Sequence, residues 1–448
     1  MKKSLVMSLV AIGFISSANG AEDLSSMFND GNVSGQVRAF YIDRQYEGSA
    51  GKTLHRNATA IGGNLKFETA DYEGLSLGAA FYTTNRVASS PDIDPSLFGK
   101  NSDGYSILGE AYLQYKYSNT IFKAGRQKLD TPLAGSDDAR MLPSLFEAYL
   151  FVNRDIPDTT LTVAHVTKFA QGSFGRAYYA SSYYTNASNL LSVTSGYTYD
   201  SGVDKTGDFL NMGDYAIGKH TDGVTVTSAV YAPNKKIKVQ LWDYYAYDIL
   251  NAVYGQADLS WNCLLTDKVH PFLSGQFIKE NDVGDKYAGN IDGIYWGAKF
   301  GAKVENFTAY VAYSQTGKND AAEAAAGGLA NAIITPWGGM PAFTQGIVTR
   351  HMFLAGTKAS KIAATYDFKD MGAKVSATVY YASFEMDKNS GYGTERTATE
   401  PGFDIIYNPE VVKNLQLRLR GNFPRKFAES AAGDTGWDEY RVIINYNF

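Results

Sequence analysis

The sequence predicts an all-β fold, a transmembrane antiparallel β-barrel of about 18 strands with one loop folded inward to constrict it. Three features predict it: apolar and polar residues alternate within many segments, the connections between segments alternate between short and long, and the last segment ends on an aromatic residue. A period of two is that of a β-strand, whose successive side chains point to opposite faces. We expect residues 21–448 to form a single transmembrane domain.

The N-terminus is typical of a secretory signal peptide, residues 1–20. Lys2 and Lys3 precede an apolar run, and small residues lead to an expected cut after Gly20. No later stretch reaches the roughly 18 apolar residues of a transmembrane helix, so any membrane crossing must use strands. We therefore expect export to the outer membrane of a Gram-negative bacterium.

The composition suits strands in a membrane. The chain has 32 Tyr and 24 Phe but only 12 Pro and 1 Cys. Aromatic residues favour strands, and their rings gather at membrane interfaces. The formal net charge of −5 argues against a nucleic-acid partner.

Alternating segments begin at Val33 and continue to the end of the chain. Each is followed by turn residues, and together they predict about 18 strands, an even number as in bacterial single-chain barrels. The expected strands are 33–44, 59–69, 75–84, 107–117, 120–127, 145–153, 158–167, 222–232, 236–246, 249–261, 267–279, 290–302, 306–315, 356–368, 372–384, 401–408, 413–423 and 438–448.

The connections sort by length, as expected when short turns face the periplasm and longer loops face outward. The long ones include 168–221 and 316–355. The short ones are Asp71–Gly74, Ser118–Asn119, Arg154–Pro157, Pro233–Lys235, Asn262–Thr266, Val304–Glu305, Lys369–Met371 and Pro409–Val412. A soluble β-sandwich has no reason to sort its loops in this way.

The last segment, EYRVIINYNF, places Tyr440, Val442, Ile444, Tyr446 and the terminal Phe448 on one face. This arrangement resembles the C-terminal strand of outer-membrane proteins, which the barrel-assembly machinery recognises. We therefore expect that machinery, membrane lipid and lipopolysaccharide as partners.

The segment NLQLRLRGNF indicates which face meets lipid. An arginine on the lipid face at the bilayer midplane costs about 2–4 kcal/mol, so the leucines must face outward and Arg418 and Arg420 inward. A barrel of this size is too wide for side chains to fill, which predicts an aqueous channel. The same phase argument places five more basic residues on the inner wall: Arg38, Lys116, Lys238, Lys299 and Arg441. Rows of Arg and Lys favour anions in pores, although any polar lumen contains some basic residues by chance.

The connection 128–144 is too long for a hairpin and carries Asp130, Asp137, Asp138 and Arg140. Folded inward it would form a constriction, and the alternative is an ordinary external loop. Asp92 and Asp94, in another connection, are expected in a solvated external loop.

The stretch GRQKLDTPLAGSDDARMLPSLFEAY, Gly125 to Tyr149, resembles the constriction-loop signature of the OprD-type (Occ) outer-membrane porins. The resemblance implies a monomeric barrel whose inward third loop narrows the lumen opposite a ladder of basic side chains. In that family such a ladder guides the carboxylate of small solutes, and acidic and carbonyl groups near the loop contact the solute's other end, so the resemblance implies the same roles here. The match covers Arg126, Asp130, Asp137, Asp138 and Arg140, and leaves the direction of Arg126 open.

The expected function is passive diffusion of small polar solutes, carboxylate-bearing ones such as amino acids, organic acids or short peptides, without a cofactor. The alternative is a general diffusion porin of low selectivity. An outer-membrane barrel enzyme or an adhesin are further alternatives, but no catalytic or metal-binding set stands out. Ser76 fits a nucleophile pattern without the helix that this pattern requires, and the histidines are not paired.

Overall fold

The computed structural model describes residues 20–47, 54–138, 140–173, 206–327, 329–390, 392, 394–430 and 433–448. The expected signal peptide lies outside these residues apart from Gly20, and so does most of the connection 168–221. No helix in the described part of the chain is long and apolar enough to span a bilayer.

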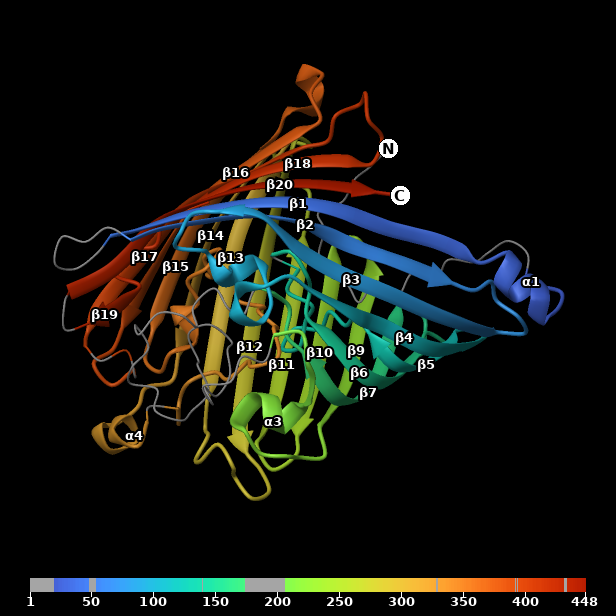
Figure 1. Ribbon diagram of the computed structural model, residues 1–448. Coiled ribbons are helices and arrows are strands. Elements are labelled where there is room, and N and C mark those ends of the chain that lie inside the picture. Colours follow the sequence, from blue (N-terminus) through green and yellow to red (C-terminus); the bar gives the residue numbers. More distant parts are fainter. Residues whose placement is uncertain are drawn as a thin grey trace.

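Eighteen strands form a closed antiparallel barrel (Figure 1), which confirms the predicted fold class. They are β1 Asn32–Glu47, β2 Leu54–Glu68, β3 Leu75–Ser89, β4 Tyr105–Tyr117, β5 Thr120–Gln127, β6 Leu145–Asn153, β7 Thr159–Ala170, β9 Val224–Asn234, β10 Ile237–Ala246, β11 Leu250–Ser260, β12 Val269–Asp282, β13 Ile294–Val304, β14 Phe307–Thr316, β15 Lys358–Asp367, β16 Val375–Met386, β17 Arg396–Tyr407, β18 Leu415–Asn422 and β20 Gly433–Asn447. Two short strands, β8 Phe209–Asn211 and β19 Ala428–Ser430, pair with β7 and β20.

The barrel closes where the last strand meets the first. β20 pairs with β18 on one side and with β1 on the other. In this register Arg38 lies opposite Asn445, and Arg420 lies opposite Arg441. We call the β1/β20 pairing the seam.

Short helices occupy the connections. The α-helices are α1 Leu24–Asn29, α3 Met212–Ile217 and α4 Ala321–Ala325, and the 3-10 helices are η2 Pro95–Leu97, η3 Lys100–Ser102, η6 His351–Phe353 and η7 Phe368–Met371. Asp23 caps α1 by accepting a hydrogen bond from the amide of Ser26. The helices α1, α3 and α4 lie at the ends of the barrel strands (Figure 1), whereas the residues of η2 and η6 are buried.

The two faces of the wall differ as the alternation predicts. Val37, Leu241, Leu419 and Val442 are exposed on the outer face, where hydrocarbon replaces water. Polar and charged side chains alternate with them on the inner face, where the lipid-face penalty for a charge does not apply. The tightest hairpins lie at one end of the barrel, as in the Ser118–Asn119 and Glu305–Asn306 connections.

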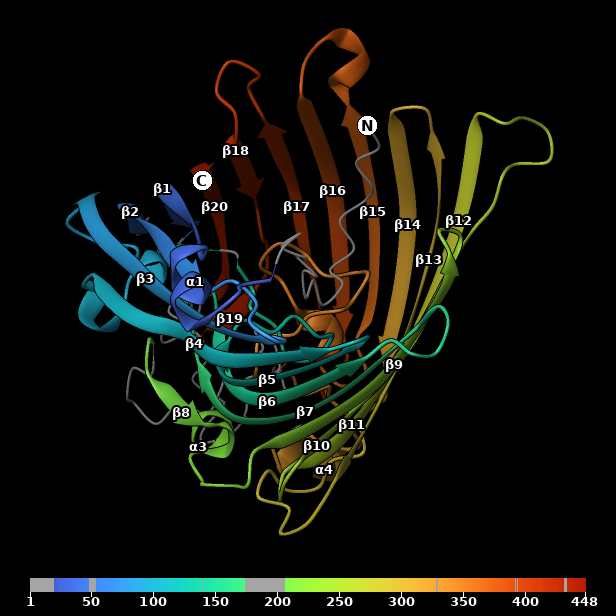
Figure 2. The same ribbon diagram turned by 90° about the vertical axis from the view of Figure 1, so that its right-hand side faces the viewer.

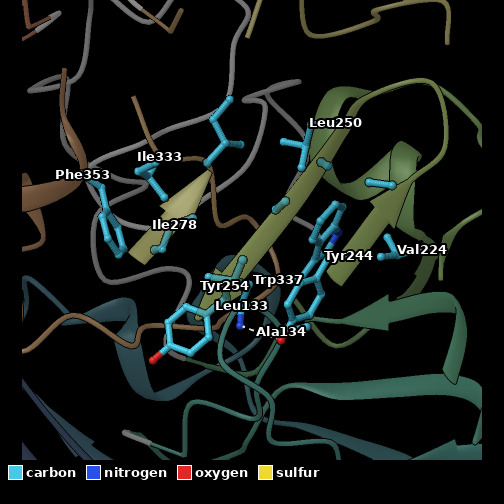
Figure 3. Close-up of a cluster of buried hydrophobic side chains, with 14 of the residues drawn as sticks. Leu133, Ala134, Val224, Tyr244, Leu250, Tyr254, Ile278, Ile333, Trp337 and Phe353 are labelled. Atoms are coloured by element: carbon cyan, nitrogen blue, oxygen red, sulfur yellow. Dashed lines mark hydrogen bonds between the residues drawn. The ribbon is translucent and has the colours of Figure 1, made fainter. Parts of the chain in front are cut away.

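Two long connections fold into the ring of strands (Figure 2). We name residues 128–144 loop 3 and residues 317–357 loop 7. Their apolar side chains, including Leu133, Ile333 and Trp337, are buried against wall residues such as Tyr244 and Ile278 (Figure 3). Leu133 also donates its backbone N–H to the Tyr244 hydroxyl at 3.2 Å. The hydrophobic core of this barrel therefore lies inside it, between its loops and its wall.

Candidate functional site

A cavity of about 610 Å³ lies between loop 3, loop 7 and the inner wall. Its lining combines loop backbone with aromatic, cationic and acidic side chains. The volume is in the range of small-molecule binding sites. The cavity is therefore large enough for a small solute and narrow enough to contact it.

The cations that line this cavity come from strands on one side of the barrel. They are Lys238 of β10, Lys299 of β13, Lys361 of β15 and Arg420 of β18, joined by Arg154 and Arg350 from connections. The Lys299 ammonium lies 4.3 Å from the centroid of the Phe343 ring, and Lys361 donates to the Gln345 carbonyl at 2.7 Å. Sequence reasoning missed Lys361. The exposed neighbour Ile362 is the signal that could have placed it on the inner face.

Acidic groups of loop 3 line the same cavity. Asp130 and Asp137 are among the lining residues. Asp130 accepts the Ser136 amide at 3.0 Å, which stabilises the turn of the loop. The cavity therefore has a basic wall and an acidic loop, two regions of opposite charge.

Arg38 fastens loop 3 to the seam. Its guanidinium contacts Asp138 at 2.6 Å, donates to the Arg140 carbonyl at 2.5 Å and donates to Asn445 at 2.8 Å. Burial alone would raise the pKa of Asp138, but the charges of Arg38 and Lys128 outweigh it and hold that pKa below its usual value. Arg38 lies on the inner face as expected, but its contacts are those of an anchor for the loop.

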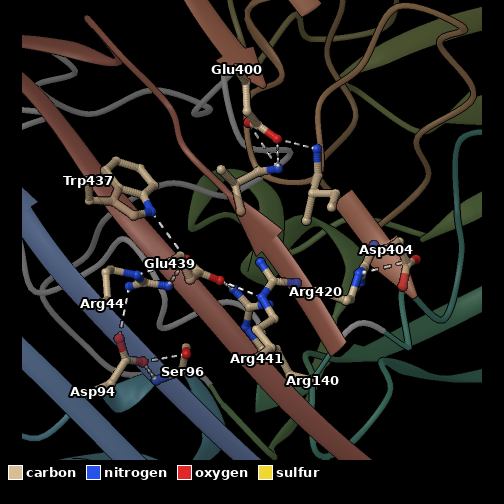
Figure 4. A network of polar contacts seen from close by, with 12 residues as sticks. Arg44, Asp94, Ser96, Arg140, Glu400, Asp404, Arg420, Trp437, Glu439 and Arg441 are labelled. Carbon is tan, nitrogen blue, oxygen red and sulfur yellow. Dashed lines mark hydrogen bonds and ion pairs between the residues drawn. The ribbon is translucent and has the colours of Figure 1, made fainter. Parts of the chain in front are cut away.

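A second anchor is a fully buried charge network at the seam (Figure 4). Glu439 of β20 contacts Arg44 at 2.9 Å, Arg140 of loop 3 at 3.3 Å and Arg441. The Trp437 indole donates to the same carboxylate at 3.1 Å. Arg140 and Arg441 have side chains that are 0% exposed, so neither reaches a solute in this arrangement.

Asp94 belongs to this network as well. The expectation of a solvated external loop is wrong for this residue, because its side chain is 0% exposed and contacts Arg44 at 3.1 Å. Asp94 also caps η2, whose residues are buried, by accepting the Ser96 amide at 3.0 Å. Asp92 remains at the surface of the same loop.

Arg418 and Arg420 share one carboxylate. Arg418 donates to Asp404 of β17 at 2.7 Å, and Arg420 lies 3.4 Å from the same side chain. Asp404 and Arg420 line the cavity. Arg418 lies two residues nearer the periplasmic end of β18, about 7 Å along the strand.

Two other expected residues lie elsewhere. Arg126, carried over with the constriction loop, shares a face with the exposed Phe122 and lies 3.8 Å from Glu147. Its side chain therefore points away from the cavity, and its assignment to the constriction is corrected. Lys116 lies on the inner face near the periplasmic end of β4, beyond the residues that line the cavity.

Loop 7 forms the other side of the cavity, which sequence reasoning missed by treating residues 316–355 as external. The Gly135 amide of loop 3 donates to the Trp337 carbonyl at 2.9 Å. Arg350 of loop 7 lies 3.2 Å from Asp137 of loop 3. The apolar run Ile333–Trp337 is the signal that could have found this, because such residues need cover.

His351 anchors the inner part of loop 7. It is fully buried, packs against the rings of Phe384, Tyr392 and Phe427, and contacts the Phe427 carbonyl through Nε2 at 2.8 Å. Burial lowers the pKa of His351 to about 4, although the hydrogen bond to Phe427 acts in the opposite sense. The imidazole is therefore neutral at pH 7.

A closed barrel with an apolar outer face, short turns at one end and a polar internal cavity defines a channel of the bacterial outer membrane. The family model described as outer membrane porin, OprD family, matches residues 25–448. The chain belongs to the OprD family of outer-membrane porins, which are channels and not enzymes.

Solved structures support the same fold. The chain resembles Pseudomonas aeruginosa OpdK, crystallised with vanillate, with a TM-score of 0.74 and 17% identity. It also resembles OccK9 (OpdG), with 0.74 and 21%, and OccK2 (OpdF) in complex with glucuronate, with 0.70 and 16%, both from the same organism. Each match covers 94% of this chain and 99% of the other. A sequence search of curated proteins found no match.

Proposed function

We propose that this porin carries small polar solutes bearing a carboxylate, such as amino acids, organic acids or short peptides, by passive diffusion. The observation that carries the proposal is the charge arrangement of the cavity: Lys238, Lys299, Lys361 and Arg420 on the wall face a loop that presents Asp130 and Asp137. Rows of basic groups attract anions, and several weak sites allow both entry and release.

The solutes in the related structures agree with this class. Vanillate in OpdK and glucuronate in OccK2 each carry one carboxylate on a ring with hydroxyl or ether groups. In this chain the aromatic residues Phe343, Trp242 and Tyr380 line the cavity beside the cations, which suits a carboxylate attached to a flat or cyclic body.

The roles of the basic residues on the inner wall, the predicted ones and Lys361, divide by exposure. Lys238, Lys299, Lys361 and Arg420 steer the anion because they line the cavity. Arg418 and Lys116 attract the anion after it leaves the cavity, because they lie further along the inner face toward the periplasm. A separate set positions loop 3 and meets no solute: Arg38, Arg140 and Arg441.

Liposome swelling tests the substrate class with matched pairs of equal size, such as succinate and succinamide. We expect the carboxylate to enter faster through the unmodified channel. The double variant Lys361→Ala with Arg420→Ala should remove this difference. Equal rates for both solutes through the unmodified channel would indicate the alternative, a general diffusion porin of low selectivity.

Other expectations join this proposal and have separate tests. We infer a monomer, to be measured by cross-linking in membranes, and cleavage after Gly20, to be measured by N-terminal sequencing. Recognition of the strand ending at Phe448 by the barrel-assembly machinery predicts impaired insertion of Phe448→Ser.

The adhesin alternative is tested by deleting residues 174–205. If the deletion variant retains its conductance, transport does not depend on that segment, and a role of the segment in adhesion can be measured separately.

A further inference from the structure

One carboxylate on the barrel wall belongs neither to the row of cations that lines the cavity nor to the charge network around Glu439 at the seam. Glu400 of β17 faces inward and is fully buried. Its oxygens accept three successive backbone amides of loop 7, from Ile347 at 2.5 Å, Val348 at 3.3 Å and Thr349 at 2.7 Å. Successive amides that point to one place form a cradle for an anion, and here the anion belongs to the protein.

The fit between carboxylate and loop is close. A Cβ atom added to Gly346 would lie 2.6 Å from the carboxyl carbon of Glu400, so only glycine leaves room for this approach. The Gly346 amide donates to the Thr349 carbonyl at 3.0 Å, which closes the turn around the cradle. The Tyr380 hydroxyl donates to Glu400 from the neighbouring strand.

The cradle borders the solute cavity. Gly346 and Ile347 are lining residues, next to Lys361 and Arg420. Lys361 also donates to the Gln345 carbonyl, at the start of the same turn. In the part of the chain that the structure describes, Glu400 forms hydrogen bonds to amides and a hydroxyl but no ion pair, so its direct partners are the amides of loop 7 and the Tyr380 hydroxyl (Figure 4).

We propose that Glu400 is the positioning residue for the inner turn of loop 7, residues 345–349, and so sets the width of the pore beside Lys361 and Arg420. Carboxylate and cradle depend on each other, because a buried charge is stable only when hydrogen-bonded and buried amides need an acceptor. Without Glu400 the turn loses the acceptor for three donors and withdraws from the wall. This inference rests on the proposed function only in that the same cavity carries the solute.

Single-channel recording in planar bilayers tests it. Glu400→Ala should raise the open-channel conductance about twofold, because conduction depends on the narrowest width of the pore, and should add current noise from the released turn. Glu400→Gln, which keeps one acceptor oxygen, should lie between. The matched control is Glu385→Gln, a carboxylate exposed on the adjacent strand β16, and should match the unmodified channel. Heat-modifiable gel mobility establishes that each variant is folded.

Acetate distinguishes a missing carboxylate from lost packing. Added to Glu400→Ala, acetate should occupy the vacated cradle and bring conductance and noise back toward the unmodified values, beyond its effect on the control. Gly346→Ala, which leaves Glu400 in place but blocks its approach, should copy the high conductance without an acetate response.

Two results would overturn the proposal. One is unchanged conductance in both Glu400 variants. The other is a raised conductance in Glu400→Ala that does not respond to acetate. If the unmodified channel showed no preference for carboxylates, the proposed function would be rejected instead. The conductance of the Glu400 variants would still test the positioning role of Glu400.

Discussion

Asp137 of loop 3 and Arg350 of loop 7 form an ion pair at 3.2 Å that joins the two inward loops across the cavity, with side chains only 17% and 7% exposed. Residues 213 positions apart in the sequence thus bound the same passage. Because both side chains are buried, the loss of either partner would leave the other as a buried charge without this ion pair, which is costly.

Breaking this pair should widen the pore. Arg350→Ala and Asp137→Ala should each raise conductance, and the double variant should raise it no further, because the two residues act as one unit with a coupling of about 0.5–3 kcal/mol. The control is Lys318→Ala, which removes a more exposed ion pair of loop 7 with Asp387. Additive effects in single-channel recordings would contradict a shared role.

Arg420 should matter more for anion preference than Arg418. Arg420 lines the cavity and Arg418 does not, although both contact Asp404. Arg420→Ala should lower the anion-to-cation permeability ratio about fivefold, since one charge at contact distance contributes about 1 kcal/mol in water. Reversal potentials in a salt gradient measure this ratio. Lys235→Ala, in a turn outside the cavity, is the control, and an equal loss in Arg418→Ala would contradict the ranking.

Glu439→Gln should destabilise the seam. It leaves three buried arginines without the carboxylate that they share, and breaking a buried pair costs about 3–5 kcal/mol. The temperature at which the barrel loses its folded gel mobility should fall, and loop 3 should add noise to the current. An unchanged temperature relative to Glu385→Gln would mean that the network contributes no net stability.

Loop 7 should loosen in acid through His351. Its pKa of about 4 in the folded chain lies below the ordinary value of 6.5, so the unfolded loop binds the proton more readily. The contribution to stability is complete above about pH 6.5 and is lost as pH falls toward 4, by roughly 3 kcal/mol. Current noise should therefore rise across that range in the unmodified channel. The rise should be weaker in His351→Gln and unchanged in the control His220→Gln, whose ring is 78% exposed.

Gly339→Ala should push the two loops apart. A Cβ atom at Gly339 would overlap the backbone of Leu133 and Ala134 in loop 3, and backbone atoms cannot move aside cheaply. We expect a larger conductance with little change in barrel stability. Gly289→Ala is the control for the effect of backbone conformation alone. Gly289 has φ +82° but open space around its Cβ position, so this variant should leave conductance unchanged.

The wall of the barrel could be predicted from the sequence, because strand alternation is local and the cost of a charge in lipid gives it a direction. The strands expected at 413–423 and 120–127 are β18 Leu415–Asn422 and β5 Thr120–Gln127. The strand expected at 75–84 extends to Ser89. Its upper part carries Asn85 and Arg86 beside exposed Val87, so the apolar alternation that marks a lipid-facing strand fades there.

The site could be predicted only in part. Strand phase is enough to place Lys238, Lys299 and Arg420 on the inner wall, where they line the cavity, and their role in transport stays a prediction. The alternation of inward and outward side chains cannot distinguish a basic group that faces water from one that a loop covers. Arg38 meets Asp138, 100 positions away, only because loop 3 folds back to the seam. Contacts of this range depend on the whole fold and leave no periodic pattern.

The seam also determines when the passage acquires its final width. Glu439 and Asn445 lie in β20, the last strand of the barrel in chain order, and loop 3 reaches them through Arg140 and Arg38. Until β20 has paired with β1, loop 3 lacks the contacts that Glu439 and Asn445 supply, while its contacts with loop 7, Tyr244 and Arg38 hold it. A half-inserted barrel would therefore be an open ring whose constriction is attached on one side only, and the step that completes the wall also completes the attachment of loop 3.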